Sequence, residues 1–379
     1  MTSVNPTNWF RKDVVMVYPL VKIYFGYSLA LGITSRKLAN QRFYSTLFSR
    51  TYALVANIIT LTVLPFVMWQ VRLVFETKMH FPQLILITYN VRYLVSYVVI
   101  SYTVLSRGFR DTAFNEMQPL LQRLLQEEKG GRCTRCGRKS LIVLIYVKFF
   151  TITWLCLTET IFLFYSNEPM NIVNIARFIF LTNATSILNM VPMGYFLALW
   201  HIARGFDNMN QRLDKIITSK SSRHLKELQD LWLLHTDLTK TALRINKIYG
   251  PQMLASRFDN FIIGVIQAYW GAFFTFRVST PILWIVYGSV QYQIRALDYF
   301  LNDYLADLVV EYQRSAKHSW SEIHWTKETS SYVIYANSLK LELRTCGLFP
   351  ANRSMWFDMV SGIWYYILVL LQFHFIMEK

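Results

Sequence analysis

The stretch MVSGIWYYILVLLQFHFIM, residues 359–377, decides the fold class of this 379-residue chain. It contains no Asp, Glu, Lys or Arg, and apolar or aromatic side chains would cover nearly every side of a helix built from it. A soluble core helix of this length would carry a polar stripe. Because about 20 apolar residues suffice to cross a bilayer, the stretch predicts a membrane-spanning helix.

Six further runs along the chain have the same character. The expected spans are residues 51–69, 81–106, 140–166, 178–203, 259–276, 278–296 and 358–377. We therefore predict an all-α membrane protein with seven transmembrane helices in a single domain over residues 1–379. Residues 14–35 form an eighth candidate, interrupted by Pro19 and Lys22. Its composition leaves open whether it spans the membrane or lies along its surface.

The composition is both hydrophobic and basic. Hydrophobic residues make up 53% of the chain and charged residues 16%, against about 25% in a typical soluble protein. This excludes a disordered chain, and 14 Gly and 4 Cys exclude collagen and a cysteine-rich scaffold. The net charge of +16 comes from 39 basic and 23 acidic residues. The remaining question is where the positive charge lies.

The basic residues alternate between successive loops. The N-terminal segment and every second connection hold 32 Lys and Arg, and the opposite side holds four. Basic residues favour the cytoplasmic side of a membrane. We therefore predict a cytoplasmic N-terminus and an extracellular C-terminus, and we interpret the charge as a topology signal rather than a nucleic-acid-binding surface.

Two long connections on the predicted cytoplasmic side carry helical periodicity. In residues 204–257, apolar side chains such as Leu231, Leu238 and Ile245 recur at helical spacing, and residues 297–350 look similar. We expect helical cytoplasmic extensions that pack together. Ordinary linker helices with one solvated face remain an alternative.

Arg92, Lys148 and Glu159 are charges away from the ends of the expected spans. A charge in a membrane helix is costly, so a functional role is the default hypothesis. Arg92 has Glu159 or an anionic ligand as candidate partners. The alternatives are a buried ion pair, or a side chain that reaches to the membrane surface.

Enzyme motifs are missing from the sequence. It contains no HExxH, GxSxG or GxxxxGK[ST], so we expect neither an enzyme nor a resident metal or cofactor. Cys133 and Cys136 form a CxxC, which is half of a zinc site without a second pair nearby. We expect reduced thiols on the cytoplasmic side.

Seven spans also suggest a G-protein-coupled receptor, but several features disagree. The predicted topology is inverted, the last span has no NPxxY, and no cysteine pair lies on the outside. A transporter is the third class considered, and the matching broken halves typical of many transporters are not visible.

The last part of the chain resembles insect gustatory receptors. It reads Leu343-Arg-Thr-Cys346-Gly347-Leu348-Phe349-Pro350, and the last span follows with Tyr366, five hydrophobic residues, Gln372 and Phe373. In that family the last span carries Thr-Tyr, five hydrophobic residues and Gln-Phe, and here Tyr365 replaces the usual Thr. The motif covers about the last 40 residues, and length and span layout extend the resemblance over the chain.

The resemblance implies a taste receptor that is a ligand-gated, non-selective cation channel, related to insect odorant receptors. It implies a homo- or heterotetramer around the last helices, with a cytoplasmic anchor domain, in the plasma membrane of sensory neurons. Residues 14–35 would then be a helix before the first span. Residues 331–347 would be the cytoplasmic part of a split seventh helix, and residues 359–377 its pore-lining part. The expected partners are membrane lipids and a small-molecule tastant, with no nucleic acid.

The pore helix suggests a gate. Tyr366, Val369 or Leu370, and Phe373 recur along one helix face, and a hydrophobic constriction can gate by dewetting. The candidate gate residues are Tyr366, Val369, Leu370, Gln372, Phe373 and Ile376. A helix-packing seam in a protein that is not a channel is the alternative.

Candidate ligand-pocket residues are chosen by their depth in the outer half of the spans. They are Glu159, Phe162, Tyr269, Trp270, Phe273 and Trp284. Bundle core is the alternative for each. Because a sugar site needs many hydrogen-bonding groups, an aromatic pocket favours bitter or otherwise aversive compounds.

Overall fold

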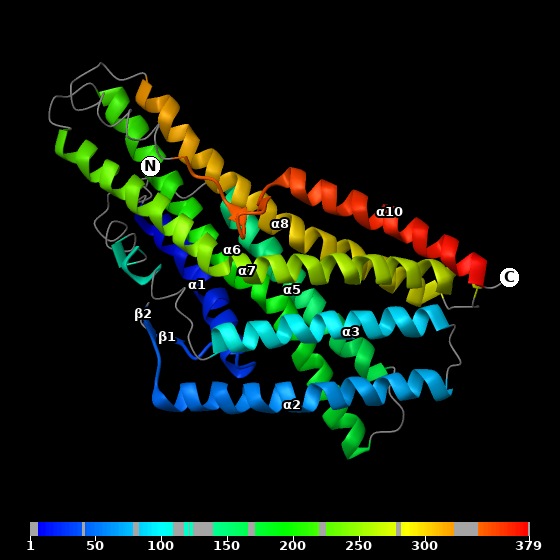
Figure 1. The fold of residues 1–379 in the computed structure, drawn as a ribbon. Helices are drawn as coiled ribbons and strands as arrows, with labels where there is room; N and C mark the ends of the chain where they lie inside the picture. The colour runs from blue at the N-terminus through cyan, green and yellow to red at the C-terminus, as the bar shows by residue number, and fades with distance from the viewer. Residues whose placement is uncertain are drawn as a thin grey trace, which may run out of the picture.

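The computed structural model describes residues 7–39, 42–78, 83–108, 117–120, 122–123, 139–165, 171–219, 225–277, 282–321 and 340–377. Long helices dominate the fold (Figure 1). They are α1 (Thr7–Ala30), α2 (Leu47–Lys78), α3 (Gln83–Thr103), α5 (Lys139–Tyr165), α6 (Ile172–Ser219), α7 (Leu225–Arg277), α8 (Ile282–Ser321) and α10 (Arg353–Met377). A π-helical turn, Val104–Gly108, continues α3.

Each expected span is helical over the residues that the structure describes. Among the described residues, five segments are long and apolar enough to cross a membrane: Leu47–Leu73, Gln83–Ser106, Ser140–Thr158, Ile172–Ile216 and Arg353–Ile376. The expected spans in α7 and α8 are helical but carry more polar groups, such as Asn260 and Gln291. The all-helical membrane fold is thus confirmed, while the number of spans and their orientation stay predictions.

Helices α6, α7 and α8 are far longer than a bilayer requires. They contain 48, 53 and 40 residues, so at 1.5 Å per residue they are about 60–80 Å long. In Figure 1 their extensions run together away from the ends of α2, α3 and α10. The helical continuation of residues 204–219, 225–257 and 297–321 agrees with the expected extensions.

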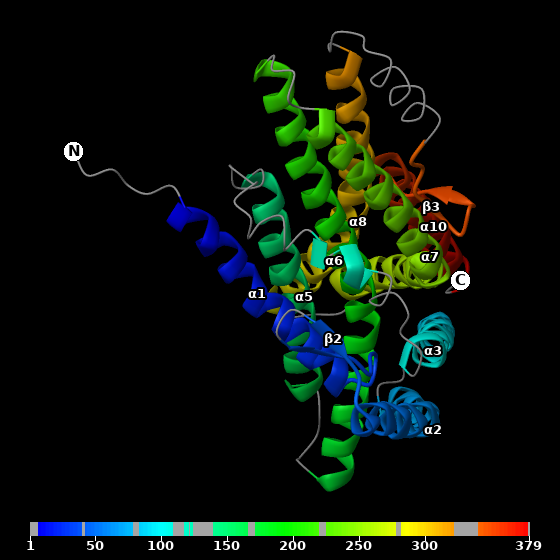
Figure 2. The same ribbon diagram turned by 90° about the vertical axis from the view of Figure 1, so that its left-hand side faces the viewer.

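Helix α6 forms the centre of the core. Its buried side chains run from Leu181 to Leu213, most densely between Met190 and Ala203, and 83% of its most apolar window is buried. Figure 2 shows α6 between α5 and α7, with α2 and α3 to one side. A helix that is apolar all round needs other helices or lipid around it, and α6 is covered mainly by other helices.

Helices α7 and α10 approach closely through two glycines. A Cβ at Gly264 would lie 2.9 Å from Ile363 Cδ1, and a Cβ at Gly362 would lie 3.2 Å from Phe261 Cε2. Small residues allow such contact between membrane helices. This reciprocal packing fixes α10 against α7.

Two short hairpins complete the fold: β1 (Lys37–Ala39) with β2 (Arg42–Tyr44), and β3 (Arg344–Thr345) with β4 (Phe349–Pro350). The second has a tight turn in which Leu348 N donates to Thr345 O at 3.0 Å. Cys346 and Gly347 have φ of 53° and 74°, the pair of positive values that a type I′ turn requires. The Cys-Gly-Leu-Phe motif thus encodes a chain reversal just before α10.

This hairpin corrects one prediction. A helix was expected over residues 331–347 and helical extension over 297–350. Residues 331–339 lie outside the described residues, but residues 340–350 are extended chain and hairpin. The helical expectation is wrong there because two consecutive positive φ angles cannot be accommodated in a right-handed helix.

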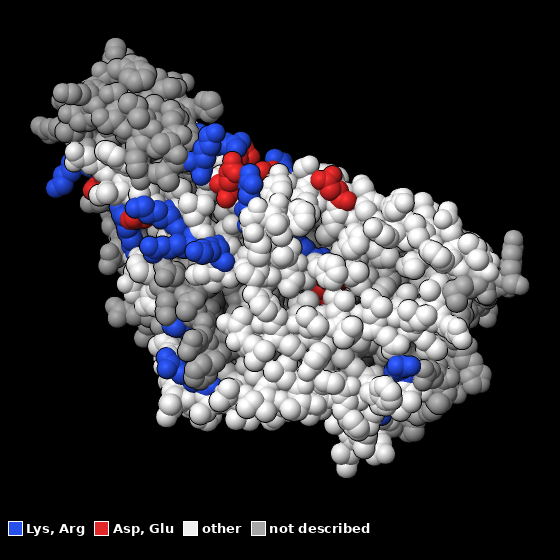
Figure 3. Space-filling view, viewed as in Figure 1, with Lys and Arg blue, Asp and Glu red and all other residues white. Residues whose placement is uncertain are grey.

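Basic side chains gather on one part of the surface. Figure 3 shows Lys and Arg mainly over the half where α6, α7 and α8 extend, while most of the face over α3, α7 and α10 is uncharged. This distribution agrees with the alternation of basic loops in the sequence.

Candidate functional site

Helix α10 lies at the edge of the bundle with one face packed and one face open. Met359, Ile363 and Ile367 are buried against α7 and α8. The opposite side exposes large apolar groups: Tyr365 is 64% exposed and Leu368 is 59% exposed. Of its most apolar window, 22% is buried, against 83% in α6. A single chain therefore leaves most of α10 uncovered.

The structure divides the candidate gate residues between these faces. Tyr366, Phe373 and Ile376 are 50%, 55% and 69% exposed. Gln372 is exposed and Val369 is half-buried. Leu370 instead packs inward, against the clusters around Ile367 and Tyr269. Five of the six thus remain available to line a pore, and Leu370 belongs to the inner packing.

Three candidate pocket residues, Tyr269, Trp270 and Phe273, come together where α3, α7 and α10 meet. Tyr269 and Phe273 are buried with Ile85, and Trp270 packs against them. Trp270 Nε1 donates to Thr88 Oγ1 at 3.1 Å. The side chains of Glu159, Phe162 and Trp284 lie outside the described part of the structure.

A residue outside the predicted set joins this aromatic cluster to the candidate gate helix. His374 is 4% exposed, its Nδ1 lies 2.9 Å from the Tyr269 hydroxyl, and its ring meets Phe273 edge-on at 5.3 Å. It directly follows Gln372 and Phe373 in α10. A polar residue in an otherwise apolar span was the available sequence signal.

Arg92 also contacts the cluster. Its guanidinium carbon lies 5.8 Å from the centre of the Trp270 ring, a cation–π arrangement. Tyr89 stacks on the same indole with the planes 11° apart. The expected partnership with Glu159 involves a side chain outside the described residues.

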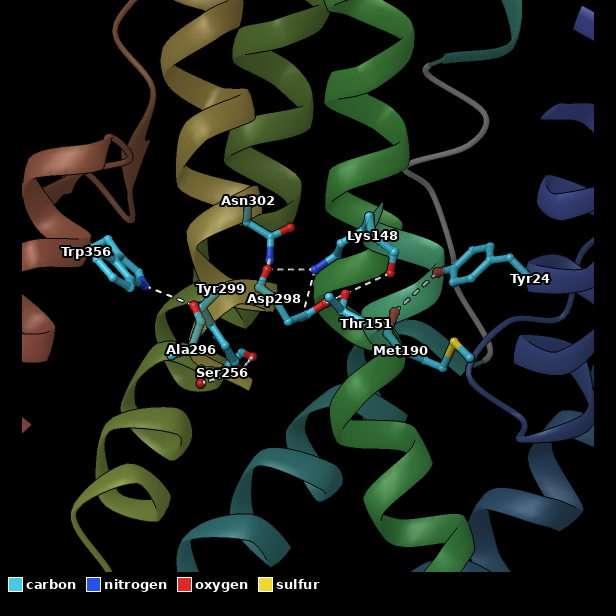
Figure 4. Close-up of polar contacts among 10 residues, drawn as sticks. All are labelled: Tyr24, Lys148, Thr151, Met190, Ser256, Ala296, Asp298, Tyr299, Asn302 and Trp356. Carbon is cyan, nitrogen blue, oxygen red and sulfur yellow. Dashed lines mark hydrogen bonds and ion pairs between the residues drawn. The ribbon is translucent and has the colours of Figure 1, made fainter. Parts of the chain in front are cut away.

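Lys148 forms a buried ion pair, one of the alternatives left open by the sequence. Its side chain is fully buried, and Nζ lies 2.8 Å from Asp298 Oδ2 and donates to Asp298 O at 2.9 Å (Figure 4). Thr151 Oγ1 donates to Asp298 Oδ1 at 2.6 Å. These contacts join α5 to α8 and satisfy charges that would be costly alone.

Further buried polar contacts join α3, α7 and α8. Arg257 pairs with Asp303, and Ser96 Oγ donates to Asp259 Oδ1 at 2.9 Å. Burial raises the pKa of the Asp303 carboxyl to about 6 and outweighs the lowering effect of Arg257.

Comparison with known proteins gives the family. The model of the 7tm chemosensory receptor family matches residues 21–377. The Drosophila erecta protein named "Putative gustatory receptor 59b" is 68% identical over 286 residues, which are 74% of this chain and 48% of that protein. The chain thus spans about half the length of this relative.

The fold also has a counterpart among solved structures. Two structures of the olfactory receptor OR5 from Machilis hrabei match the fold of this chain. The TM-score is 0.66 for its complex with eugenol and 0.65 for the second structure. In both cases the sequence identity is 13%, and the match covers 95% of this chain and 99% of the other. At this identity the likeness concerns the fold. From the family match over residues 21–377, this non-enzymatic, multi-pass membrane protein belongs to the 7tm chemosensory receptor family.

Proposed function

We propose that the chain is a gustatory receptor that works as a ligand-gated, non-selective cation channel for small organic compounds, bitter or aversive ones in particular. The observation that carries this proposal is the uncovered apolar face of α10, the helix with the Tyr366 to Phe373 motif. In a lone chain this face would meet only lipid, whereas copies of the chain arranged around an axis would cover part of it and line a pore with the rest.

In the proposed assembly four subunits, identical or related, place their α10 helices around a central pore in the plasma membrane of sensory neurons. The N-terminus is cytoplasmic and the C-terminus extracellular, as the basic loops favour. Gln372, Phe373 and Ile376 form the gate, with Val369 and Tyr366 on adjoining turns. The exposed rings and aliphatic groups would close the pore by excluding water.

Low ion selectivity follows from the composition of the proposed pore. Residues 359–377 contain no charged side chain other than titratable His374, whose ring is buried against α7. With no ring of carboxylates and no array of backbone carbonyls facing the ion, the pore would pass hydrated monovalent cations alike.

The proposed ligand wall is the cluster of Tyr269, Trp270 and Phe273, with Glu159, Phe162 and Trp284 as further candidates. Aromatic faces with few hydrogen-bonding groups fit a small aromatic compound better than a sugar. The eugenol complex of the Machilis receptor supports this ligand class. The ligand opens the gate only by the difference between its affinities for open and closed states.

Expression in oocytes tests the proposal. A panel of aromatic bitter compounds is compared with sugars, and responding cells are recorded again in excised inside-out patches without GTP. The proposal predicts compound-evoked cation current that persists in the patch and is larger for the aromatic compounds. Evoked current that disappears without GTP would instead favour a metabotropic receptor.

A further inference from the structure

A segment of about two turns in α8 receives side chains from three other helices. We name this segment, Ala296–Asp303, the α8 junction. From α7, Ser256 lies 2.7 Å from the Tyr299 hydroxyl, and Arg257 pairs with Asp303. From α5 and α10 come Lys148 and Trp356, both drawn in Figure 4. The junction therefore fixes α5, α7 and α10 relative to a single short segment of backbone.

The contact from α10 is directional. Trp356 Nε1 donates to Ala296 O at 3.0 Å, and its indole meets the Phe300 ring edge-on with centroids 5.1 Å apart. Near the start of α10, Arg353 Nε lies 2.6 Å from Asp307 Oδ2. The base of the candidate gate helix is thus attached to α8 at two positions, Ala296 and Asp307.

The contact from α5 reaches the same segment. Lys148 Nζ donates to Asp298 O, two residues beyond the carbonyl that Trp356 binds. Asn302 Nδ2 donates to that oxygen as well, at 3.2 Å. Lys148 and Asp298 are 0% and 3% exposed in their side chains, so this attachment lies deep in the bundle.

We propose that Trp356 is a positioning residue of the gate: through Ala296 it holds the base of α10 on the α8 junction in the closed arrangement. The inference rests on the proposed function. Helices α5 and α7 carry candidate pocket residues and contact the same junction. A ligand that shifts either helix therefore changes the position of the base of α10 on α8.

Geometry explains why a contact so far from the gate matters. Phe373 lies 17 residues beyond Trp356 in one continuous helix, about 25 Å along its axis. A tilt of a few degrees at the base then moves the gate by about 2 Å. Because the hydrogen bond is partly buried, solvent compensates for its loss only in part.

The test compares two tryptophan variants in oocytes. Trp356→Phe keeps a ring against Phe300 but removes the N–H donor. Trp200→Phe is the matched control, because Trp200 Nε1 donates to Leu141 O at 2.8 Å in the core between α6 and α5. Leak current is measured without added compound. It is the part of the inward current that disappears when N-methyl-D-glucamine replaces sodium in the bath, and it is divided by the amount of receptor at the cell surface.

We expect Trp356→Phe to raise this leak by about fivefold over the wild type, as the loss of one hydrogen bond implies, and Trp200→Phe to leave it within about twofold. Equal leak in the two variants, or a lower leak in Trp356→Phe, would overturn the inference. If Trp356→Phe does not reach the surface, Arg353→Gln replaces it, with Arg123→Gln as the control for loss of an ion pair outside α10.

Failure of the proposed function looks different. Wild-type receptor that reaches the surface but gives no current with the aromatic panel would count against the channel itself. Wild-type receptor that responds, while Trp356→Phe and Trp200→Phe leak alike, would count only against the role of Trp356.

Discussion

At the scale of single residues, the contact between Tyr269 and His374 is the direct connection from the candidate ligand wall to the candidate gate helix. Tyr269 is fully buried, and its hydroxyl lies 2.9 Å from His374 Nδ1. The candidate gate residues Gln372 and Phe373 stand immediately before that histidine. The packed inner face of α10 and the candidate gate residues on its outer face therefore lie within three residues of each other.

A stability measurement tests this contact. His374→Leu removes the hydrogen bond between the His374 ring and the buried Tyr269 hydroxyl, which should cost about 1–3 kcal/mol. Adding Tyr269→Phe removes the hydroxyl as well, so the double variant should melt at a higher temperature than His374→Leu alone. Melting is followed by fluorescence-detected size exclusion, with Tyr365→Phe as an exposed control. A double variant no more stable than His374→Leu would contradict the hydrogen bond.

Lys148 and His374 show which contacts could not be predicted from the sequence. Lys148 could be singled out as a costly charge in a span, but its partner Asp298 lies 150 residues further along the chain. Periodicity places side chains on faces of one helix and carries no information on which faces meet. His374 was missed for the same reason, since its significance depends on Tyr269 across the α7–α10 contact.

At the scale of elements, apolar runs and helical spacing predicted nearly all the long helices, because both follow from local sequence. The span at 178–203 proved to be the centre of α6, a helix of 48 residues that no single window delimits. The hairpin at Cys346 and Gly347 was expected to be helix. Its signal, a glycine in a tight turn, is too short to outweigh the surrounding pattern.

The attachment of α5 to α8 gives an element-level prediction. Lys148→Met keeps most of the side-chain volume but leaves the Asp298 carboxylate buried without its cation, and should destabilise the receptor by about 3–5 kcal/mol. Adding Asp298→Asn removes the unpaired charge and should restore much of the yield and melting temperature. Lys226→Met, at an exposed position of α7, is the control. Equal losses in the single and double variants would show that the ion pair is not what joins these helices.

At the scale of the whole molecule, α10 is the feature that a single chain leaves incomplete. Its inner face is closed by Gly264, Phe261 and the other side chains of α7 and α8, while the outer face is open. The long extensions of α6, α7 and α8 and their basic surface fit a cytoplasmic region in which subunits meet. Neither the order of the subunits nor their number can be deduced from the sequence pattern, since both depend on contacts between chains.

Cysteine crosslinking tests the assembly. Ile376 is 69% exposed on the outer face of α10, and Ile367 is 4% exposed against α7. Ile376→Cys should give covalent dimers with copper phenanthroline in membranes, because symmetric copies bring this position together. Ile367→Cys should give no more covalent dimer than the unmodified chain. That chain is the background control, because it already contains four cysteines. Equal crosslinking in Ile376→Cys, Ile367→Cys and the unmodified chain would argue against α10 at the axis.

The most direct test of the central claim, that α10 lines the pore of an ion channel, is modification of Gln372→Cys during recording. Receptor carrying this substitution is purified, reconstituted in planar bilayers without any G protein, and opened with an active aromatic compound. A charged methanethiosulfonate reagent should then reduce the current severalfold, while the unmodified chain is unaffected. Full labelling of Gln372→Cys with unchanged conductance would contradict the account.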